Sequence, residues 1–438
     1  MLKKFKQHLH QNFPFLEDGK LLIAISGGID SVVLAHLCSQ LNLNFSLCHC
    51  NFNLRGQESN DDEAYVKDLA KNLQVPVYTS SFETEKYATK NKVSIQVAAR
   101  DLRYAWFYEL LENKQYDYVL TAHNTNDNLE TFIINLTRGT GLEGFTGIPP
   151  INNKAVRPLL AFSRDEITLF AIKNEIDWRE DKSNASIKYI RNKVRHKVIP
   201  ILQEINPHVL ESFQNTLEYL NESQSIINDA TKNISQKIVS YEHNLLTLNC
   251  KKLNELPNKK AYLYQLLHTY GFTAWNDVVD LVSGQPGKQV FSKTHRLLKD
   301  RNFLILTTNN QNLTEKGPFV IKETSTEISY PIKLTILNTT DSTPENNHQI
   351  IINKDLVTYP LSLKKWRHGD AMHPTGMTGS KKISQLFKDK KLSLLDKEKI
   401  WLLADAKDRI IWVIGLRQDR RFTADKTATN RLKISFIS

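Results

Sequence analysis

The chain has 438 residues, enough for two or three domains, and its 40% hydrophobic and 24% charged residues are typical of globular proteins. Its four cysteines form no CxxC pair and no apolar run approaches a membrane span, which argues against zinc ribbons, disulfide scaffolds and integral membrane proteins. Lysine and arginine number 58 against 47 acidic residues, so the net charge of +11 favours a polyanionic partner, nucleic acid before a membrane surface.

Short apolar runs and longer helix-like segments alternate in the first 140 residues. The apolar runs predict buried parallel strands at Leu21–Ser26, Phe45–Cys50, Val75–Thr79 and Asp117–Ala122. The segments between and after them predict helices at Ser31–Leu41, Asp61–Leu73, Ser94–Asn113 and Asn126–Thr137. This order predicts an α/β domain over residues 1–205, built on a doubly wound parallel sheet.

The pattern changes after residue 205. Residues 206–310 are predicted to form a helical linker and a small mixed α+β domain, with one long amphipathic helix over His208–Tyr241. Shorter helices are expected at 258–270 and 275–282, and short strands at 288–292, 295–299 and 303–308. Residues 311–348 contain two polar stretches and are predicted as a linker with strands. Residues 349–438 are predicted as a small β-rich C-terminal domain.

The segment Ser26–Ser31 reads SGGIDS and lies between the first strand and the first helix. Its glycines let the backbone approach an anion, and the following helix start offers free N–H groups. Asp30 can hold Mg²⁺ on nucleotide phosphates. The predicted nucleotide-binding residues are Ser26, Gly27, Gly28, Ile29, Asp30 and Ser31. The segment is neither a Walker A loop nor GxGxxG, and the alternative is a turn that only caps the helix.

Polar residues also follow the second strand, in the segment HCNFNLR. His49, Asn51 and Arg55 suit hydrogen bonding to a base or ribose. The alternative is a loop that leads into a helix capped by Asn60 or Asp61. A zinc site on Cys48-His49-Cys50 is disfavoured because alternation on a strand points the histidine away from both cysteines.

Two arginines, Arg100 and Arg103, lie three residues apart on the helix that reads QVAARDLRY. They share one face and can clamp phosphates through their guanidinium groups. The alternative is a solvated basic edge with Asp101 as an ion-pair partner.

The segment TAHNTNDNLET, Thr121–Thr131, follows the fourth strand. His123, Asp127 and Glu130 are its candidate catalytic or substrate-binding residues. Asp127 and Glu130 share a helix face, and paired carboxylates can hold a metal ion or an ammonium group. The alternative is helix capping by acids that favour the helix dipole.

Two further segments have unusual composition. Arg138–Pro149 is rich in glycine, which indicates backbone close to another group or a mobile flap. Residues 186–197 contain five basic residues and no acid, which predicts a polyphosphate-binding stripe. These basic residues are Lys188, Arg191, Lys193, Arg195 and Lys197. The alternative is the solvated face of a linker.

Together these segments resemble the tRNA(Ile)-lysidine synthetases, a family of PP-loop ATP pyrophosphatases. The resemblance covers residues 21–202 through SGGIDS, HCNFNLR, ARDLRY, TAHNTNDNLET, RGTGLEGFTGIP, RPLL, DKSN and RNKVR. It continues in the tail through RHGD, HPTG, GSKKISQLFKD and IIWVIGLR. The middle of the chain matches only in length and in its helix-then-strand character.

The resemblance implies a ligase that forms a carbon–nitrogen bond. In this family ATP adenylates O2 of the wobble cytidine of the tRNA(Ile) that carries a CAU anticodon. The ε-amine of free L-lysine then attacks C2 and AMP leaves. The resemblance makes Asp127 and Glu130 candidate receptors for the amine. It makes basic residues candidate tRNA contacts, namely Arg191, Lys193 and Arg195 with the tail lysines Lys364, Lys365, Lys381, Lys382, Lys388, Lys390 and Lys391.

The chain departs from the family pattern at two places. Asn126 and Asn128 stand where the family usually has an acid and a glutamine, so a second metal ligand or general base is in doubt. Phe52 and Asn53 replace a usual histidine and glycine.

Two rival functions remain open at this point. A tRNA thiolase of the same superfamily needs nucleophilic or cluster-binding cysteines, and the four cysteines without a CxxC pair weigh against it. A non-catalytic tRNA-binding protein would have a degenerate nucleotide loop, whereas SGGIDS is intact. We expect a cytoplasmic protein with reduced thiols and no membrane partner, and the sequence leaves a homodimer open.

Overall fold

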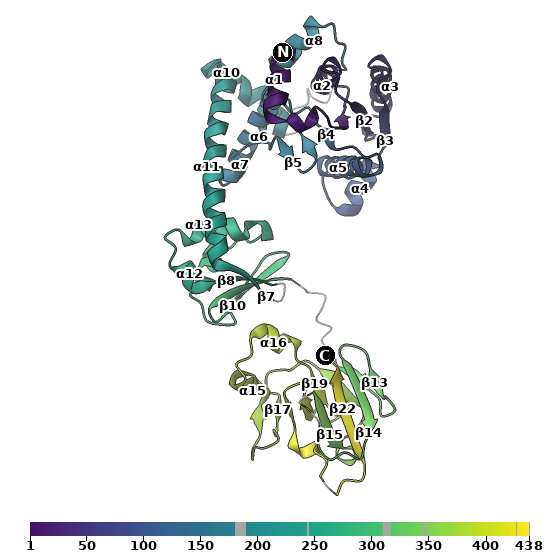
Figure 1. Ribbon diagram of the computed structural model, residues 1–438, viewed down its shortest axis with the longest axis vertical. Helices are drawn as coiled ribbons and strands as arrows, with labels where there is room; N and C mark the ends of the chain where they lie inside the picture. The colour runs from purple at the N-terminus through teal and green to yellow at the C-terminus, as the bar shows by residue number, and fades with distance from the viewer. Residues whose placement is uncertain are drawn as a thin grey trace. The chain divides into compact units, whose positions relative to one another are not determined.

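The computed structural model describes residues 1–179, 190–242, 245–309, 317–344, 346, 348–425 and 427–437 (Figure 1). The chain divides into two compact units, Met1–Asp229 and Ala230–Ser438. No helix in the described ranges is long and apolar enough to cross a membrane. The DKSN motif and Lys188, which were predicted to belong to the site region, lie outside the described residues.

The first unit is built on a six-stranded sheet in the order β3-β2-β1-β4-β6-β5. All neighbouring strands are parallel except β5 and β6. The strands are β1 Leu21–Ala24, β2 Phe45–Asn51, β3 Val77–Ser81, β4 Tyr118–Leu120, β5 Ile151–Asn152 and β6 Ala155–Val156. Because the chain adds β2 and β3 on one side of β1 and β4 on the other, the predicted doubly wound parallel fold is confirmed.

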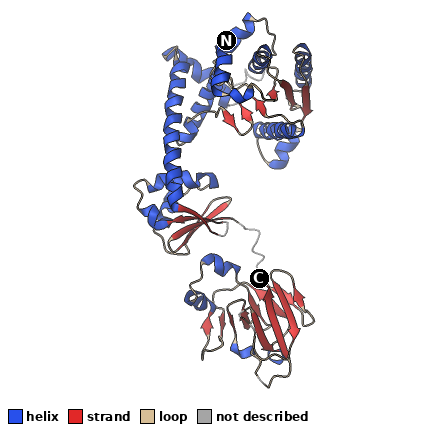
Figure 2. Ribbon diagram, viewed as in Figure 1, coloured by secondary structure: helices blue, strands red, loops and turns tan. Residues whose placement is uncertain are grey.

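Helices cover both faces of this sheet (Figure 2). The helices of this unit are α1 Leu2–Asn12, α2 Ile29–Gln40, α3 Gln57–Asn72, α4 Thr84–Asn91, α5 Ile95–Asn113, α6 Thr125–Arg138, α7 Leu142–Phe145, α8 Arg164–Lys173, α9 Ile190–Lys193, α10 Ile199–Ile205 and α11 Val209–Ile238, with a π-helical turn η3 at Val194–Val198. The last residues of α11 belong to the second unit. Leu21 and Ile23 of β1 pack with α1, α2, α3 and α8, whereas Leu22 packs with α5. Alternation along the strand therefore separates two core layers.

Helices α1, α4, α7 and α8 were not among the predicted elements. Helix α3 begins at Gln57, and its N-cap is Gly56 with φ of 55°. Asn60 and Asp61 therefore lie inside the helix, and the suggested cap at either residue is wrong. Glycine adopts this left-handed conformation without a Cβ clash, which lets the chain turn into α3 early.

The second unit begins with the antiparallel sheet β7-β8-β11-β10-β9. Its strands are β7 Val239–Glu242, β8 Leu245–Asn249, β9 Gln289–Phe291, β10 His295–Asp300 and β11 Phe303–Thr308. Helices α12 Cys250–Asn254, α13 Lys259–Leu267 and α14 Trp275–Val282, with the 3₁₀ turn η4 His268–Tyr270, pack on it through one apolar cluster. These elements agree with the helices and strands expected in this region.

The C-terminal part contains two further sheets, β12-β16-β19-β20-β21 and β13-β14-β22-β15, and a β17-β18 pair. Its elements are β12 Phe319–Ile321, β13 Glu327–Ile328, β14 Lys333–Asn338, β15 Gln349–Asn353, β16 Leu361–Lys364, β17 Ala371–Met372, β18 Lys381–Lys382, α15 Ile383–Asp389, α16 Leu394–Lys399, β19 Leu402–Ala404, β20 Ile410–Val413, β21 Arg417–Gln418 and β22 Arg431–Ile437. Strand β12 pairs with β16, and β14 pairs with β22. The predicted domain start at residue 349 is therefore too late, because a boundary there would separate β12 and β14 from the strands with which they pair.

Candidate active site

One cavity of about 870 Å³ opens at the carboxyl ends of β1 and β4. These strands are parallel neighbours at the point where the strand order reverses, the usual ligand site of doubly wound sheets. Its charged lining residues are three aspartates and six arginines: Asp30, Asp62, Asp127, Arg55, Arg103, Arg164, Arg179, Arg191 and Arg195. Because the arginines outnumber the aspartates, the cavity suits an anionic ligand such as a nucleoside triphosphate.

The loop after β1 is held by its own two serines. The Ser26 N–H donates to Ser31 Oγ at 3.1 Å, and Ser31 Oγ donates to the Gly28 carbonyl at 2.9 Å. Gly27 has φ of 90°, a conformation that L side chains rarely adopt. No side chain among the described residues caps α2, so the first turn of this helix can present N–H groups to an anion.

Asp30 lies in the first turn of α2 and contacts two residues from distant parts of the chain. The Asn124 amide donates to Asp30 Oδ1 at 3.0 Å, and the Arg164 guanidinium pairs with Oδ2. Burial is the main cause that raises the pKa of Asp30, and the negative charge of Asp127 adds to it, although Arg164 opposes both. A second carboxylate therefore lies close enough to disfavour the ionised form of Asp30.

Asp127 both caps α6 and lines the cavity. Its Oδ2 accepts the Asn124 N–H at 3.1 Å, while Asn124 Oδ1 accepts the Asp127 N–H at 3.1 Å. This capping box agrees with the alternative that the sequence left open. Its Oδ1 accepts from Arg195 Nη2 at 3.1 Å. The carboxylate thus stays at the cavity wall with a fixed orientation.

Glu130 is fully buried and does not line the cavity. Arg191 Nε donates to it at 2.8 Å, and Arg195 donates through Nε at 2.5 Å and Nη2 at 3.2 Å. In this structure Glu130 therefore holds two arginines that line the cavity. Of the predicted basic stripe, Arg191 and Arg195 point inward, whereas Lys193 is exposed.

His123 lines the cavity beside Asp127. Its Nδ1 lies 3.0 Å from the Thr121 hydroxyl. Burial lowers the pKa of His123 to about 4, against the opposing charge of Asp127. The ring is therefore neutral near pH 7 and does not repel a cationic substrate.

The residues predicted after the second strand divide into structural and cavity-facing groups. The His49 ring donates from Nδ1 to the Ile25 carbonyl at 2.9 Å. The Asn51 amide donates to Asn60 and Glu63 at 3.1 Å each, so both predicted residues are buried and neither lines the cavity. Arg55 does line it and pairs with Asp62 at 2.8 Å.

Arg100 and Arg103 also separate in the structure. Arg103 lines the cavity and lies 5.3 Å from the centre of the Phe52 ring. Arg100 is exposed, outside the cavity lining, and lies over the Tyr104 ring at 5.0 Å. The cavity-facing position of Arg103 fits a phosphate contact, whereas the position of Arg100 fits the alternative of a solvated edge.

Three arginines near the cavity were absent from the predicted set. Arg164 begins α8 after the capping box of Ser163 and Glu166, a signal that was visible in the sequence. The Arg179 N–H donates to the Gly27 carbonyl at 3.0 Å, which ties the chain after α8 to the nucleotide loop. Arg157, in the RPLL motif, is 2% exposed and pairs with no carboxylate in the described part of the chain. No local pattern in the sequence signals these long-range contacts.

The two asparagines that depart from the family pattern have defined partners. Asn126 Oδ1 accepts the Arg164 N–H at 3.0 Å, and Asn128 Oδ1 accepts the Ile148 N–H at 2.7 Å. A Cβ at Gly147 would lie 2.3 Å from Asn128 Oδ1, so the glycine-rich segment packs tightly on α6. Of the two options for this segment, close backbone approach is the one the structure supports.

Two cysteines, Cys48 and Cys50, line the cavity. Burial raises the pKa of Cys48 well above its usual value and that of Cys50 to about 12. Their thiols are protonated near pH 7, and the thiolate is the reactive form. No group of three metal-ligating side chains occurs in the described residues. The protonated state of both thiols weighs against a thiolase that uses them as nucleophiles.

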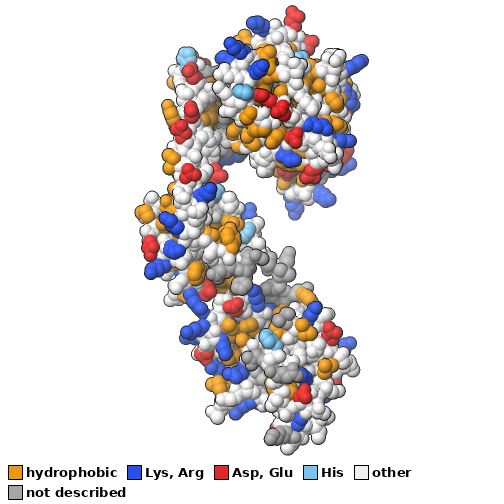
Figure 3. Space-filling view, in the orientation of Figure 1, with side chains coloured by type: hydrophobic (Ala, Val, Ile, Leu, Met, Phe, Trp, Pro, Cys, Tyr) orange, Lys and Arg blue, Asp and Glu red, His pale blue; other side chains and the backbone are white. Residues whose placement is uncertain are grey.

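The tail lysines differ in how available they are. Lys364 is buried and pairs with Asp370 and Asp408, and Lys365 donates to the Glu398 carbonyl at 2.6 Å. The ammonium groups of these two lysines are therefore held by contacts within the protein, and their predicted contact with tRNA is not supported. Lys381 pairs with Asp389, whereas four lysines of the same region are exposed: Lys382, Lys388, Lys390 and Lys391. Figure 3 shows lysine and arginine side chains on the surface of both units.

Comparisons with known proteins agree with this geometry. Family models match residues 1–202 as a PP-loop domain, residues 240–309 as a TilS substrate binding domain and residues 361–434 as a TilS substrate C-terminal domain. The chain is 38% identical to the tRNA(Ile)-lysidine synthase of Parabacteroides distasonis, covering 96% of each protein. It is 36% identical to that of Bacteroides thetaiotaomicron, covering 96% of this chain and 95% of the other. With PP-loop residues at the switch point and relatives over nearly its full length, the chain belongs to the tRNA(Ile)-lysidine synthase family.

Proposed function

We propose that this chain joins lysine to C2 of the wobble cytidine of tRNA(Ile) with a CAU anticodon, and that the cavity at β1 and β4 is where both chemical steps occur. Membership of the family makes it an ATP-using ligase that forms a carbon–nitrogen bond on tRNA(Ile). The observation that carries the location is that Asp30 and Asp127 line one cavity with the PP-loop, and that Asn124 hydrogen-bonds to both.

In the first step O2 of the cytidine attacks the α-phosphorus of ATP, and pyrophosphate leaves as the bond to the bridging oxygen breaks. Ser26–Ser31 and the uncapped start of α2 bind the phosphates. Arg164, Arg191 and Arg195 offer planar guanidinium groups to the charge that develops on the phosphate oxygens. Carboxylates already orient all three, so little reorganisation is required when ATP binds.

Mg²⁺ fits this site as a companion of the triphosphate. Mg²⁺ is commonly held by one or two carboxylates together with phosphate oxygens. Asp30 lines the cavity, and burial together with the charge of Asp127 disfavours the ionised form of the Asp30 carboxyl group. A cation bound here would favour the ionised form instead. Asp30 would hold the ion, and the ion would supply charge neutralisation to the phosphates.

In the second step the neutral ε-amine of lysine attacks C2, the bond from C2 to the oxygen of AMP breaks, and the amine loses a proton. Lysine enters as an ammonium ion, so the site must bind a cation and remove a proton. We assign both tasks to the end of β4: the Asp127 carboxylate attracts the ammonium and accepts its proton, and neutral His123 beside it adds no repulsion. Glu130 acts through Arg191 and Arg195, whose positions it fixes.

Transfer RNA is expected to contact the exposed basic residues of both units. Lys193 next to the cavity and Lys382 in the C-terminal part are exposed and are assigned to phosphate contacts. A cytoplasmic location follows from this substrate. A homodimer remains a prediction that the molecular mass in solution tests.

The test is to incubate the protein with radiolabelled lysine, ATP and either tRNA(Ile) with a CAU anticodon or the tRNA(Met) that shares this anticodon. Label in tRNA(Ile) alone, with AMP and pyrophosphate released in equal amounts, is the expected result. Label in neither RNA, with a folded protein that still binds tRNA, would favour the non-catalytic alternative.

A further inference from the structure

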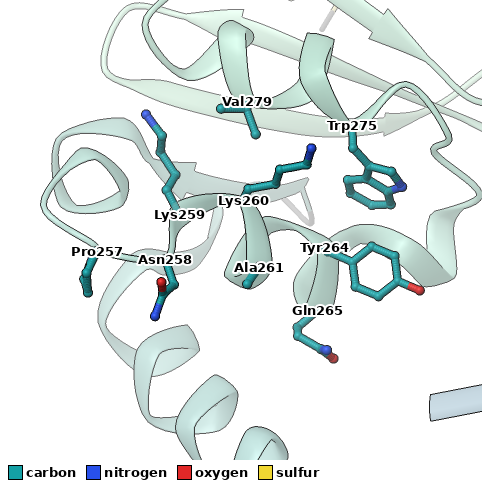
Figure 4. A pocket seen from close by; sticks show the side chains of 9 residues that line it. All are labelled: Pro257, Asn258, Lys259, Lys260, Ala261, Tyr264, Gln265, Trp275 and Val279. Carbon is teal, nitrogen blue, oxygen red and sulfur yellow. The ribbon is translucent and has the colours of Figure 1, made fainter. Parts of the chain in front are cut away.

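Residues of helices α13 and α14 line an open groove of about 640 Å³ in the part of the chain matched as a substrate binding domain (Figure 4). Its wall contains two lysines, Lys259 and Lys260, and two aromatic residues, Tyr264 and Trp275. None of the described residues that line it is acidic. The groove is therefore positive and aromatic, unlike the arginine-and-carboxylate cavity of the first unit.

The aromatic wall is held in a fixed arrangement. The ring centres of Tyr264 and Trp275 are 4.9 Å apart with their planes at 58°, and His268 stacks on Tyr264 at 5.1 Å and 14°. Trp275 is only partly buried, although it packs against the core of this domain. A rigid, partly exposed indole offers a face on which a flat ligand can stack at little entropic cost.

Each lysine of the groove has a side-chain amide as its hydrogen-bond partner. Lys260 Nζ donates to Asn276 Oδ1 at 2.9 Å, and Lys259 Nζ donates to Asn254 Oδ1 at 2.8 Å. Both partners are neutral amides, and among the described residues no carboxylate forms an ion pair with either ammonium group. Amide partners orient the two cations without neutralising them, which suits an anionic ligand.

We propose that this groove binds one unpaired nucleotide of the tRNA, with its base stacked on Trp275 and Tyr264 and its phosphates at Lys259 and Lys260. The inference rests on the proposed tRNA substrate. A nucleotide in a helix has both faces of its base covered by neighbours, so only an unpaired nucleotide of a loop, a bulge or a strand end can stack on protein side chains. Charge selects this occupant over an apolar peptide, because a peptide would leave both ammonium groups without a counter-charge.

The first test reverses one charge of the groove. Lys260→Glu should raise the KM for tRNA about tenfold and lower the salt dependence of binding, with kcat at saturating tRNA unchanged. Lys293→Glu makes the same change at an exposed lysine of this domain outside the groove and should alter KM less than threefold. Equal effects of the two variants would show only general electrostatic attraction and would overturn the proposal.

The second test separates stacking from charge. Stacking of a base on an aromatic residue contributes about 1–3 kcal/mol, so Trp275→Ala should raise the KM for tRNA about tenfold. Trp275→Phe keeps an aromatic face and should stay within threefold of the wild type. If the wild type transfers lysine and Trp275→Ala, with an unchanged melting temperature, keeps the wild-type KM, the groove is not a nucleotide site. A wild type that transfers no lysine contradicts the proposed function instead.

The third test locates the contact directly. Ultraviolet irradiation of the full-length protein with tRNA(Ile) should give a nucleotide adduct on Trp275 or Tyr264, identified by mass spectrometry of the peptides. The nucleotide in the adduct should come from an unpaired position of the tRNA. Adducts confined to other peptides, or competition by an apolar peptide and not by single-stranded RNA, would overturn the assignment.

Discussion

The arginines around the nucleotide loop and the exposed lysines of the C-terminal part are all positively charged, but they differ in burial and in ion pairing. Arg164, Arg191 and Arg195 are each held by a carboxylate and line a cavity. Lys382 and Lys388 are exposed, and no carboxylate pairs with them in the part of the chain that the structure describes. The first set is preorganised for one geometry, whereas the second is adaptable and hydrated.

This difference predicts which basic residues act in catalysis and which act in the binding of tRNA. Guanidinium groups fixed in a partly buried site stabilise charge where it develops, and substitution there should lower kcat. Exposed ammonium groups release counterions when RNA binds, and substitution there should raise KM in a salt-dependent way. The predictions below test this separation, beginning with the largest expected effect.

Asp30→Ala should abolish adenylation, with a loss of about a thousandfold or more in the release of pyrophosphate. The substitution removes the proposed Mg²⁺ ligand and leaves Arg164 without its partner. The measurement is release of pyrophosphate with tRNA and ATP. Asp18→Ala, at an exposed acid of the same unit, is the control and should retain wild-type activity. A folded Asp30→Ala protein that releases pyrophosphate at a near-normal rate contradicts the assignment.

Asp127→Asn should slow lysine transfer about a hundredfold or more while ATP binding persists. The amide keeps the shape of the side chain and loses the charge that attracts the ammonium. Single-turnover measurements should show adenylated tRNA accumulating when lysine is supplied. Asp101→Asn changes an exposed acid on α5 and should have no effect. Wild-type rate and wild-type KM for lysine in Asp127→Asn would rule out this role.

Arg195→Lys should lower kcat/KM for tRNA about tenfold to a hundredfold, chiefly through kcat. A lysine keeps the charge and cannot reproduce the contacts that Arg195 makes with both Glu130 and Asp127. Lys193→Ala, two residues away and exposed, should change only KM, by less than threefold. If both variants acted only on KM, the proposed division between cavity and surface charges would fail in this segment.

The sheet and the nucleotide loop were predictable because their signals are local. Four apolar runs gave β1 to β4 within a few residues, and SGGIDS lies between a strand and a helix as expected. Helix α8 was missed although Ser163 and Glu166 carry a capping box, and with it Arg164 was missed. The cause is that only the fold reveals that the start of α8 lies beside Asp30.

The roles of charged residues were the hardest to predict because charge alone does not specify a partner. Glu130 and Arg195 were assigned separately to lysine and to tRNA, yet they form one ion pair. Lys364 was expected to contact tRNA, yet two aspartates hold it in the core. The i, i+3 and i, i+4 spacings identify a shared helix face and do not show which neighbour packs against it.

Deletion of residues 317–438 should raise the KM for tRNA about tenfold and flatten its salt dependence, while adenylation at saturating tRNA persists. The deletion begins at 317 because β12 and β14 pair with strands of the C-terminal sheets. A four-residue variant, alanine at Lys382, Lys388, Lys390 and Lys391, keeps the fold and should reproduce part of the effect. Unchanged affinity and unchanged salt dependence in both proteins would assign the tail another role.

The smallest predicted effect concerns His123 and the pH dependence of stability. Burial lowers the pKa of this ring to about 4 in the folded protein, whereas an unfolded histidine has a pKa near 6.5. Between these values the unfolded chain binds more protons, so the free energy of unfolding should fall as the pH drops from 6.5 toward 4. The contribution of one such group is at most about 1.4 kcal/mol per pH unit.

His123→Gln removes this titration and keeps a polar side chain next to Thr121. The melting temperature of the variant should therefore decline less than that of the wild type between pH 6.5 and 5. The pKa of Asp30 is also shifted, but it is raised, so the folded state binds this proton more tightly than the unfolded state does. Asp30 therefore increases the free energy of unfolding as the pH falls, which is opposite to the effect of His123. This contribution is present in both proteins and cancels in the difference. Parallel melting curves across this pH range would show that burial does not lower the pKa of His123, and the assignment of a neutral ring beside Asp127 below pH 6.5 would be wrong.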